Sequence, residues 1–395
     1  MSQHSASKQY LTITLSYWAF TLTDGALRML VLLFFHNLGY TPLELASLFI
    51  LYEFFGILTN LYGGWLATRI GVTRCLHIGL GLQILALGML TVDASILSLI
   101  YVMIAQAISG IAKDLNKMSA KSSIKLLLND HQQTKLYRWV ALLTGSKNSL
   151  KGLGFFLGGF LMANLGFGDS LQALMALLGI TLVLSLVFLQ SQTTSYKPKF
   201  TETLSKSRDI NLLSAARLFL FGSRDIWFVV ALPVFLQSQL QWTHLQVGSF
   251  MACWVMGYGL IQAIAPKITG SNQQQTPRGS ALTSWVTRLA VIPALIAGAL
   301  AYGLDPAMVL IIGLLIYGGV FAINSSIHSF LIVAFSKRDS VSADVGFYYM
   351  ANAAGRLTGT LLSGIIYQQY GLTVCLLGSA IMVIISSILS AKITR

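Results

Sequence analysis

Long apolar stretches and short polar interruptions alternate along almost the whole chain. From Tyr10 onward, runs of about 20 mostly apolar residues recur, which is the length that an α-helix needs to cross roughly 30 Å of hydrocarbon. The pattern predicts an all-α integral membrane protein with twelve transmembrane helices and no soluble domain. The predicted helices cover residues 10–35, 43–67, 75–92, 96–116, 137–165, 170–190, 211–238, 244–267, 280–302, 307–333, 341–368 and 371–391.

Composition agrees with this pattern. Of the 395 residues, 55% are hydrophobic and 10% are charged, whereas soluble domains usually carry about 25% charged residues. The chain is therefore expected to lie in a lipid bilayer along most of its length.

The net charge of +13 suits either nucleic acid or a membrane surface, and the positions of the basic residues decide between them. The loops that follow odd-numbered predicted helices contain no Lys or Arg. Basic residues gather at the N-terminus and after even-numbered helices: Lys8, Arg69, Arg74, Lys121, Lys125, Lys135, Arg138, Lys197, Lys199, Lys206, Arg208, Lys267, Arg278, Lys337, Arg338, Lys392 and Arg395. This is the positive-inside distribution, so we expect both termini in the cytoplasm and no nucleic-acid partner.

The first apolar run is expected to be retained, because it contains Asp24 and Arg28 and ends without a small-residue cleavage site. The three cysteines, Cys75, Cys253 and Cys375, fall in different predicted helices without paired spacing. They are interpreted as small buried hydrophobic residues rather than as a disulfide or a metal site. Neither a metal nor another cofactor is predicted.

The chain is expected to consist of two halves joined by a polar loop. The longest central interruption, SQTTSYKPKFTETLSKSRD, covers 191–209 and contains Pro198. It predicts an N-terminal six-helix bundle at 1–190, a cytoplasmic loop at 191–210 and a C-terminal six-helix bundle at 211–395.

Two weak internal repeats support this division. LGYTPLEL at 38–45 matches LQWTHLQV at 240–247, and KNSLKGLGFFLGG at 147–159 matches NAAGRLTGTLLSG at 352–364. Parallel repeats of six helices that move against each other around a central site are typical of one large class of secondary transporters.

These features resemble the major facilitator superfamily, whose members have six plus six helices, cytoplasmic termini and a long basic central loop. After the second helix, this superfamily usually has a glycine, an Asp-Arg or Asp-Lys pair, a second glycine and further basic residues. In GGWLATRIGVTR, Gly64, Arg69, Gly71 and Arg74 fit this signature, whereas Thr68 stands at the acidic position. The departure weakens the expected inner-gate charge interaction and leaves open whether another contact replaces it.

The fifth predicted helix contains the glycine-rich stretch GLGFFLGG. It is similar to the close-packed fifth helix of the superfamily. The alternative is packing of small residues in lipid without any gating role.

Charged residues also lie inside the predicted helices, where each costs at least roughly 2.5 kcal/mol at the helix centre. The basic ones are Arg28, Lys113, Lys117, Lys147, Lys151, Arg217, Arg224, Arg288 and Arg356, and the acidic ones are Asp24, Glu53, Asp114, Asp225 and Asp344. Those near helix ends, such as Lys113, Lys117, Arg217 and Asp344, have an alternative explanation, because long side chains reach water from there. Arg288 is interpreted as structural.

Five charges come out near the midplane, about 14–22 Å from the cytoplasmic edge at about 1.5 Å per residue. They are Asp24, Lys147, Lys151, Arg224 and Arg356. By resemblance to the superfamily, the helices that carry them line a central cavity. Helical spacing places Tyr17, Thr21, Asp24 and Arg28 on one polar stripe, and Arg217, Phe221, Arg224 and Phe228 on another.

The predicted substrate site contains more cations than anions. Arginine forks bind phosphate-like oxyanions bidentately and lysines add point charge, so the site suits a small molecule with several negative charges. The predicted substrate-binding residues are Tyr17, Arg28, Lys147, Asn148, Lys151, Arg224, Asn352 and Arg356, with Asn324 and His328 as further hydrogen-bonding neighbours.

The acidic residues Asp24, Glu53 and Asp225 have two interpretations. They are either ion-pair partners that offset the desolvation of buried cations or proton carriers. Asp24 has two candidate partners, Arg28 one turn away and a lysine of another predicted helix. Glu53 is the preferred carrier, because no basic residue lies near it in the sequence.

The sequence contains neither a GxxxxGK[ST] phosphate loop nor an HExxH zinc helix. His77, His131 and His328 are too scattered for a catalytic cluster. We therefore predict a transporter that uses ion or substrate gradients, and not an enzyme.

Four longer segments are similar to the organoarsenical efflux permeases of bacterial arsenic-resistance operons, the ArsJ type. They are YWAFTLTDGALRML, SGIAKDLNKMSAKSSIKLL, RWVALLTGSKN and LSAARLFLFGSRDIWFVVALPVFL. The resemblance implies export of 1-arseno-3-phosphoglycerate, which glyceraldehyde-3-phosphate dehydrogenase makes from arsenate, and hence arsenate resistance. A monomer in the bacterial inner membrane is expected, with proton antiport as one mode of coupling.

Other functions remain open. The nearest alternative is a major facilitator permease for another organic phosphate or small anion. An exporter of cationic drugs would show an acidic surplus at the midplane, and a receptor or scaffold would need no buried charge. Lys113, Lys117 and Lys121, each one turn apart, are either a cytoplasmic funnel toward the site or an ordinary positive-inside flank.

Overall fold

The computed structural model describes residues 3–40, 45, 47–129, 131–191, 207–242, 244–269, 277 and 279–393. Most of the predicted central loop, at 192–206, lies outside this part of the chain. So do 41–44 and Thr243, which belong to the first internal repeat.

The described chain is built from helices. They are α1 (Gln3–Asn37), α3 (Ile50–Ile70), α4 (Val72–Met89), α5 (Leu99–Leu127), α6 (Gln133–Phe188), α8 (Arg208–Phe228), α9 (Ala231–Ser238), α10 (His244–Ile268), α11 (Gly279–Ala301), α12 (Pro306–Phe335) and α13 (Val341–Ala391). In the described residues, eight segments are long and apolar enough to cross a membrane, and α8 and α9 together form one of them.

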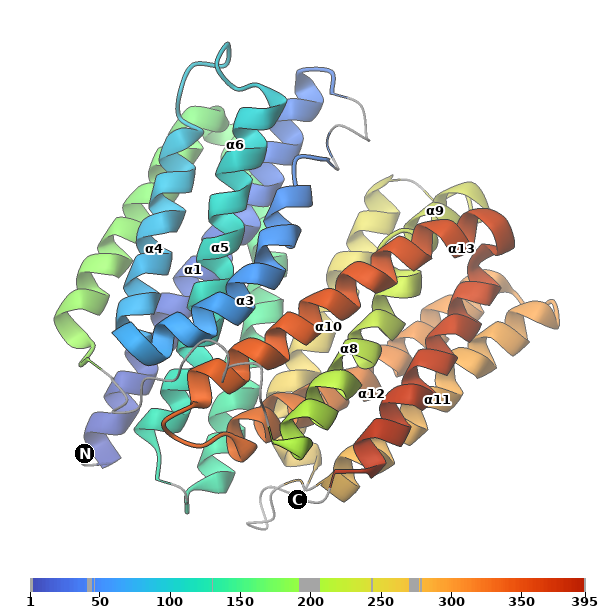
Figure 1. Cartoon of the computed structure of the whole chain (residues 1–395). Helices are drawn as coiled ribbons and strands as arrows, with labels where there is room; N and C mark the ends of the chain where they lie inside the picture. The colour runs from blue at the N-terminus through green and yellow to red at the C-terminus, as the bar shows by residue number, and fades with distance from the viewer. Residues whose placement is uncertain are drawn as a thin grey trace. The chain divides into compact units, whose positions relative to one another are not determined.

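Two of these helices each contain two spans. α6 is interrupted at Gly166, with φ of 75°, and α13 at Gly371, with φ of 76°. A positive φ is easily adopted by glycine, so each helix reverses direction without a longer loop, as Figure 1 shows for α13. With α6 and α13 each counted as two spans, these eight segments supply ten spans in the described residues. The remaining two predicted spans correspond to α3 and α5, which are long helices that carry charged residues, and the predicted all-α membrane class is confirmed.

Predicted boundaries differ from the structure at three places in particular. α5 continues to Leu127, beyond the predicted end at residue 116, because Lys117, Lys121 and Lys125 remain helical although they interrupt the apolar pattern. The loops expected after residues 165 and 368 are reduced to the turns at Gly166 and Gly371.

Contacts divide the chain into two compact units. Unit 1 contains 1–132, 146–205 and 336–350, and unit 2 contains 133–145, 206–335 and 351–395. The long helices α6 and α13 therefore contribute residues to both units. The division into domains at 191–210 stays a prediction.

Close approaches at glycine hold unit 1 together. α5 packs against α1, α3 and α4. A Cβ atom on Gly110 of α5 would lie 2.5 Å from the backbone oxygen of Tyr52, and one on Gly154 of α6 would lie 3.0 Å from the Cα of Gly25. Larger residues would push these helices apart, so the glycines let polar side chains of neighbouring helices meet.

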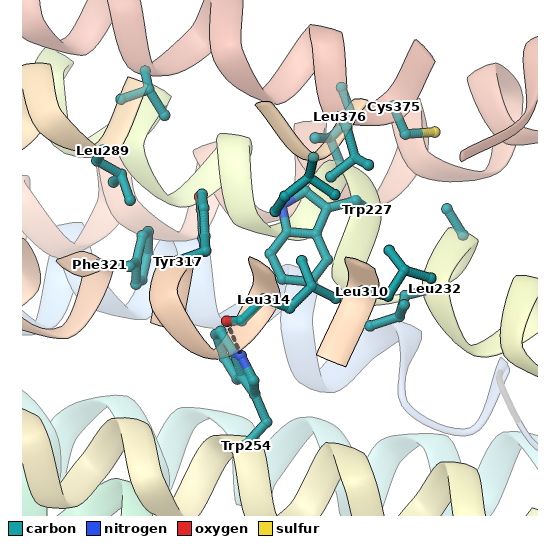
Figure 2. Close-up of a cluster of buried hydrophobic side chains, with 14 of the residues drawn as sticks. Trp227, Leu232, Trp254, Leu289, Leu310, Leu314, Tyr317, Phe321, Cys375 and Leu376 are labelled. Atoms are coloured by element: carbon teal, nitrogen blue, oxygen red, sulfur yellow. Dashed lines mark hydrogen bonds between the residues drawn. The ribbon is translucent and has the colours of Figure 1, made fainter. Parts of the chain in front are cut away.

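Unit 2 has a core of aromatic and aliphatic side chains (Figure 2). Trp227 of α8 is fully buried and meets Trp254 and Tyr317 edge to face, with ring centroids 6.0 and 5.2 Å apart. Trp254 of α10 donates a hydrogen bond from Nε1 to the carbonyl of Leu314 in α12, at 2.7 Å (Figure 2). The core fixes α8, α10 and α12, which also carry most of the polar groups of this unit.

Candidate functional site

Unit 1 contains a cluster of charges from three helices. Arg28 of α1 donates a hydrogen bond from Nη2 to Oε1 of Glu53 in α3, at 2.9 Å. Lys113 of α5 lies 3.9 Å from Glu53 and 3.6 Å from Asp114, and Lys117 pairs with Asp114. We call Arg28, Glu53, Lys113, Asp114 and Lys117 the unit 1 cluster.

Tyr52 joins this cluster to Asp24. Its hydroxyl donates to the Asp24 carboxylate, 2.8 Å from Oδ1 and 3.0 Å from Oδ2. Its ring lies 4.1 Å from the guanidinium carbon of Arg28 and 3.8 Å from Nζ of Lys113. The ring faces of aromatic residues attract cations, so Tyr52 holds two cations and one carboxylate in a fixed arrangement.

Glycine lets α3 and α5 meet at this cluster. A Cβ atom on Gly56 would lie 2.6 Å from Oδ2 of Asp114. Asp114 is almost fully buried, and a larger residue at position 56 would displace its carboxylate from the lysines. Toward the C-terminal end of α5, Lys121 forms a hydrogen bond with the hydroxyl of Tyr349, whose ring lies 4.3 Å from Nζ of Lys117.

The structure changes two interpretations of these charges. Glu53 has no basic neighbour in the sequence, yet Arg28 and Lys113 lie beside it, so the sequence argument for Glu53 as a proton carrier is lost. For charges near helix ends, the alternative was that their long side chains reach water. This alternative is wrong for Arg217 and Asp344, because they are only 3% and 4% exposed. Lys113 and Lys117 are bound by carboxylates inside unit 1, and their role as a funnel stays a prediction.

Four further predicted site residues lie in unit 1 near the contact between α1 and α6. Tyr17 is buried, and Lys147, Asn148 and Lys151 are partly buried on α6. The carbonyl of Lys151 lies 2.8 Å from the position of a Cβ on Gly25. The backbone of α6 at Lys151 is therefore close to α1, and the role of these four residues in one site stays a prediction.

Unit 2 contains a second cluster of charges, formed by Arg224, Asp225 and Arg356. Arg224 binds Oδ1 of Asp225 through Nε at 2.6 Å and Nη2 at 2.5 Å. Arg356 of α13 donates from Nε to Oδ2 of Asp225 at 3.3 Å. The Asp225 side chain is 1% exposed, whereas those of Arg224 and Arg356 are 15% and 37% exposed. One buried carboxylate therefore holds two arginines that solvent partly reaches; we call these three residues the unit 2 cluster.

Aromatic rings position Arg224. Its guanidinium carbon lies 5.0 Å from the ring centre of Phe221, 5.8 Å from that of Phe228 and 5.7 Å from that of Phe321. Phe221 and Phe228 belong to the stripe on α8 that the sequence predicted. The rings reduce the freedom of the side chain, so the guanidinium is preorganised for a ligand.

A third group of polar side chains surrounds Arg217, two turns from Arg224 on α8. Arg217 donates from Nε to Oδ1 of Asn352 at 2.9 Å, and from Nη1 to Oγ of Ser325 at 3.1 Å. Gln262 of α10 also donates to Oγ of Ser325, at 2.9 Å. His328 follows Ser325 by one turn on α12 and is fully buried.

Several of these residues were not predicted. Tyr52 stands in an apolar stretch and carries no sequence signal for its contacts. Ser325 and Gln262 were also missed. For Ser325 a signal existed, because the polar run NSSIHS at 324–329 is unusual inside an apolar helix.

Each unit contains a similar close contact between two helices at a glycine, α1 with α6 in unit 1 and α8 with α13 in unit 2. The charged residues beside this contact differ between the units. A Cβ on Gly154 would lie 2.6 Å from the oxygen of Leu22, and a Cβ on Gly359 would lie 2.6 Å from the oxygen of Gly222. Leu22 thus corresponds to Gly222, which makes Asp24 the counterpart of Arg224. By the same register, Lys151 corresponds to Arg356.

The unit 2 cluster combines two arginines with the single carboxylate of Asp225. The unit 1 cluster combines Arg28, Lys113 and Lys117 with Glu53 and Asp114, and Tyr52 adds the carboxylate of Asp24. In the described residues, no three of His, Cys, Asp and Glu come together as metal ligands would. The arrangement therefore favours an anionic ligand, because arginine side chains offer several donors for oxyanions.

The sequence profile of the Major Facilitator Superfamily matches residues 12–343. No curated protein sequence matches the chain. Among solved structures, the human organic anion transporter MFSD10 is 15% identical, with a TM-score of 0.75 and coverage of 98% of this chain and 99% of that one.

Two symporters are similar in the same way. The E. coli fucose:proton symporter is 12% identical, with a TM-score of 0.73 and coverage of 98% of this chain and 100% of that one. The proton:xylose symporter XylE is 11% identical, with a TM-score of 0.78 and coverage of 98% and 96%. At these identities the likeness concerns the fold, and it agrees with the all-helical membrane fold described above.

Proposed function

Because the chain belongs to the Major Facilitator Superfamily and is a membrane transporter of that fold, we propose that it exports an anionic organoarsenical, 1-arseno-3-phosphoglycerate, from the cytoplasm by alternating access. The observation that carries the proposal is the unit 2 cluster. Two arginines share one buried carboxylate there, and solvent partly reaches both of them.

The cluster suits a tetrahedral oxyanion for an electrostatic reason. Arg224 and Arg356 both bind the single carboxylate of Asp225. An incoming phosphate or arsenate group accepts hydrogen bonds from guanidinium groups, which are planar and permanently charged. A cationic substrate would be repelled by the two arginines, so drug-type cations are disfavoured.

The choice of an organoarsenical rests on the resemblance of four long segments to arsenic-resistance permeases. Two of them, SGIAKDLNKMSAKSSIKLL and YWAFTLTDGALRML, supply the unit 1 cluster except Glu53. Cys75 and Cys375 are buried and Cys253 is exposed, all three as free thiols, which fits a pentavalent oxyanion better than trivalent, thiol-seeking arsenic. The alternative is a permease for another organic phosphate or small anion.

The transporter acts in a bacterial inner membrane as a monomer with cytoplasmic termini, and depends on glyceraldehyde-3-phosphate dehydrogenase for its substrate. Proton antiport is the proposed coupling, with Asp24, Glu53 or Asp225 as the titrating group. Lys113 and Lys117 attract the anion from the cytoplasm.

Everted membrane vesicles test the proposal. They receive glyceraldehyde-3-phosphate dehydrogenase, NAD, glyceraldehyde 3-phosphate and labelled arsenate, and the label inside the vesicles is measured. We expect uptake that requires the complete mixture and is absent in vesicles without the transporter. No uptake, or equal uptake of arsenate or phosphate alone, would contradict the proposal.

A further inference from the structure

We propose that residues 336–350 form a latch, which is attached to unit 1 in this structure and detaches when the transporter changes conformation. This role rests on alternating access, which is part of the proposed function, and goes beyond it, because it assigns a task to Arg338 and to the first part of α13. Transporters built from two repeats work largely by movement of one repeat against the other. A segment that crosses from one unit into the other has to follow or resist this movement.

The latch belongs to a different unit from the rest of its helix. Residues 336–350 pack in unit 1, whereas α13 belongs to unit 2 from residue 351 onward. The helix continues through this boundary, and its interruption lies farther along, at Gly371. Movement between the units therefore bends α13 or detaches the latch from unit 1. Which of the two occurs depends on how firmly the latch is attached.

Arg338 attaches the latch to the C-terminal end of α5. Its Nη2 donates a hydrogen bond to the carbonyl of Leu126 at 2.9 Å, and its Nη1 donates to that of Leu128 at 2.6 Å. The last carbonyls of a helix lack partners within the helix and carry partial negative charge. Arg338 itself is exposed, so water and salt weaken both hydrogen bonds. This attachment therefore breaks at a modest cost.

Tyr349 attaches the other end of the latch. Its hydroxyl accepts a hydrogen bond from Nζ of Lys121, and its ring centre lies 4.3 Å from Nζ of Lys117. Between the two ends, the backbone of α13 lies directly on α3, since a Cβ on Gly64 would lie 2.7 Å from the carbonyl oxygen of Ser342. The latch thus contacts both α3 and α5 of unit 1.

A second segment crosses in the opposite direction, at the equivalent place of the internal repeat. Residues 133–145 of α6 pack in unit 2, while the rest of that helix belongs to unit 1. The repeat that matches 147–159 with 352–364 also matches residue 145 with residue 350, the last residue of each crossing segment. Both halves of the chain therefore exchange the start of the same helix.

The two crossing segments are held differently. Tyr137 of the segment in unit 2 is fully buried; its ring centre lies 4.9 Å from that of Phe330, and its hydroxyl accepts a hydrogen bond from Thr269 at 3.1 Å. Burial of an aromatic side chain removes a large apolar area from water, so this attachment is costly to break. The hydrogen bonds of Arg338 are open to water, so residues 336–350 are the segment that detaches.

Maleimide labelling of a buried cysteine in the purified full-length protein tests the latch. In a variant without native cysteines, Ser342→Cys places the thiol inside the latch. Ser214→Cys is the reference in unit 2, because Ser214 and Ser342 are both 2% exposed. Each thiol reacts only when the contacts around it open, and we expect position 342 to react at least about fivefold faster than position 214.

Variants of the exposed turn assign this opening to Arg338. In Arg338→Gln, labelling at position 342 should become about fivefold faster, because both hydrogen bonds to α5 are lost. Lys337→Gln is the matched control, since Lys337 is the neighbouring exposed cation; it should change the rate less than about twofold. Arg338→Lys keeps the charge without the forked donor and should give a rate between the two; it serves where the glutamine variant does not fold.

Equal rates at positions 342 and 214 in the parent protein would overturn the latch, and so would an unchanged rate at position 342 in Arg338→Gln. A rise that Lys337→Gln reproduces, or that position 214 shares, would also overturn it, because the fold would then have loosened as a whole. Labelling uses no substrate, so the result is separable from the test of the proposed function. Opening that depends on Arg338, without uptake of the organoarsenical by vesicles, retains the latch and removes the substrate. Uptake without such opening does the reverse.

Discussion

Asp225 is the residue on which the unit 2 cluster depends. Its carboxylate is buried and binds Arg224 and Arg356 at 2.5 and 3.3 Å. It therefore occupies the donors that an oxyanion would use, and it competes with the substrate. The same carboxylate stabilises the fold, because two neighbouring cations repel each other without it.

Asp225→Asn should separate these two effects. We expect the binding of an alkylphosphonate to become tighter, by about tenfold, because the competing charge is removed. Stability should fall, by an amount below the roughly 3–5 kcal/mol of a fully buried broken pair, because the arginines are partly exposed. Calorimetry and thermal unfolding measure the two effects; weaker phosphonate binding would show that Asp225 only supports the site.

Tyr52→Phe tests the link between Asp24 and the unit 1 cluster. The variant keeps the ring that contacts Arg28 and Lys113, and it removes the hydroxyl that donates to Asp24. A buried carboxylate that loses its donor costs about 1–3 kcal/mol, so the unfolding temperature should fall and transport should weaken. Tyr302→Phe is the control, because Tyr302 is 85% exposed; similar losses in both variants would contradict the role of Tyr52.

The sequence predicted most charged residues of the site, since charge in an apolar helix is conspicuous. It did not predict their pairing. Arg28, one turn away, was one candidate partner for Asp24; in the structure Arg28 binds Glu53, and Asp24 accepts a hydrogen bond from Tyr52. Partners on different helices depend on how the helices pack, and short-range spacing contains no information on that.

At the scale of helices, close approaches at glycine bring charges together. Gly359 of α13 packs against α8 beside the unit 2 cluster: a Cβ there would lie 2.6 Å from the oxygen of Gly222 and 3.0 Å from Cβ of Asp225. Two backbones at this distance leave no space for a methyl group. The packing of α8 on α13 therefore fixes the distance between Asp225 and Arg356.

Gly359→Ala should displace α13 from α8. Overpacking of this kind typically costs about 1–3 kcal/mol, and the hydrogen bond from Arg356 to Asp225 should lengthen, which lowers transport. Gly364→Ala is the matched control on the same helix, because a Cβ there meets nothing within 4 Å. Unfolding temperature and vesicle uptake are compared; equal behaviour of the two variants would contradict the packing argument.

Helix positions were predictable from the apolar runs, and the turns at Gly166 and Gly371 were not. The sequence also did not predict which contact Thr68 makes at the acidic position of the superfamily signature. In the structure, the hydroxyl of Thr68 donates a local hydrogen bond to the carbonyl of Trp65, at 2.6 Å. In unit 1, a Cβ on Gly64 would lie 3.0 Å from the Cα of Gly346, and Arg338 donates to the carbonyls of Leu126 and Leu128 at 2.9 and 2.6 Å.

At the scale of the whole molecule, the chain forms two units, and α6 and α13 each contribute to both. Hydropathy predicts the number and order of the helices, because each must cover the hydrocarbon. It does not predict which helices have residues in both units. The internal repeats correspond in backbone packing, yet Asp24 occupies in unit 1 the place that Arg224 occupies in unit 2, so the two units have diverged in charge.

Topology follows from the distribution of basic residues and is testable in a variant without native cysteines. Ser95→Cys lies in an exposed loop after an odd-numbered helix, and Lys337→Cys in an exposed segment after an even-numbered one. With both termini cytoplasmic, a membrane-impermeant maleimide should label position 95 in intact cells and position 337 in everted vesicles. The reverse pattern would contradict the orientation.

The central claim is that the arginines of the unit 2 cluster bind a multiply charged oxyanion during transport, and uptake by everted vesicles tests it most directly. Vesicles with the wild-type protein, Arg224→Gln or Arg288→Gln receive the mixture that generates the labelled organoarsenical. We predict saturable uptake for the wild type, a loss of at least about tenfold for Arg224→Gln, which is about 1.4 kcal/mol, and little change for Arg288→Gln at equal expression. Equal uptake by the wild type and Arg224→Gln would contradict the claim.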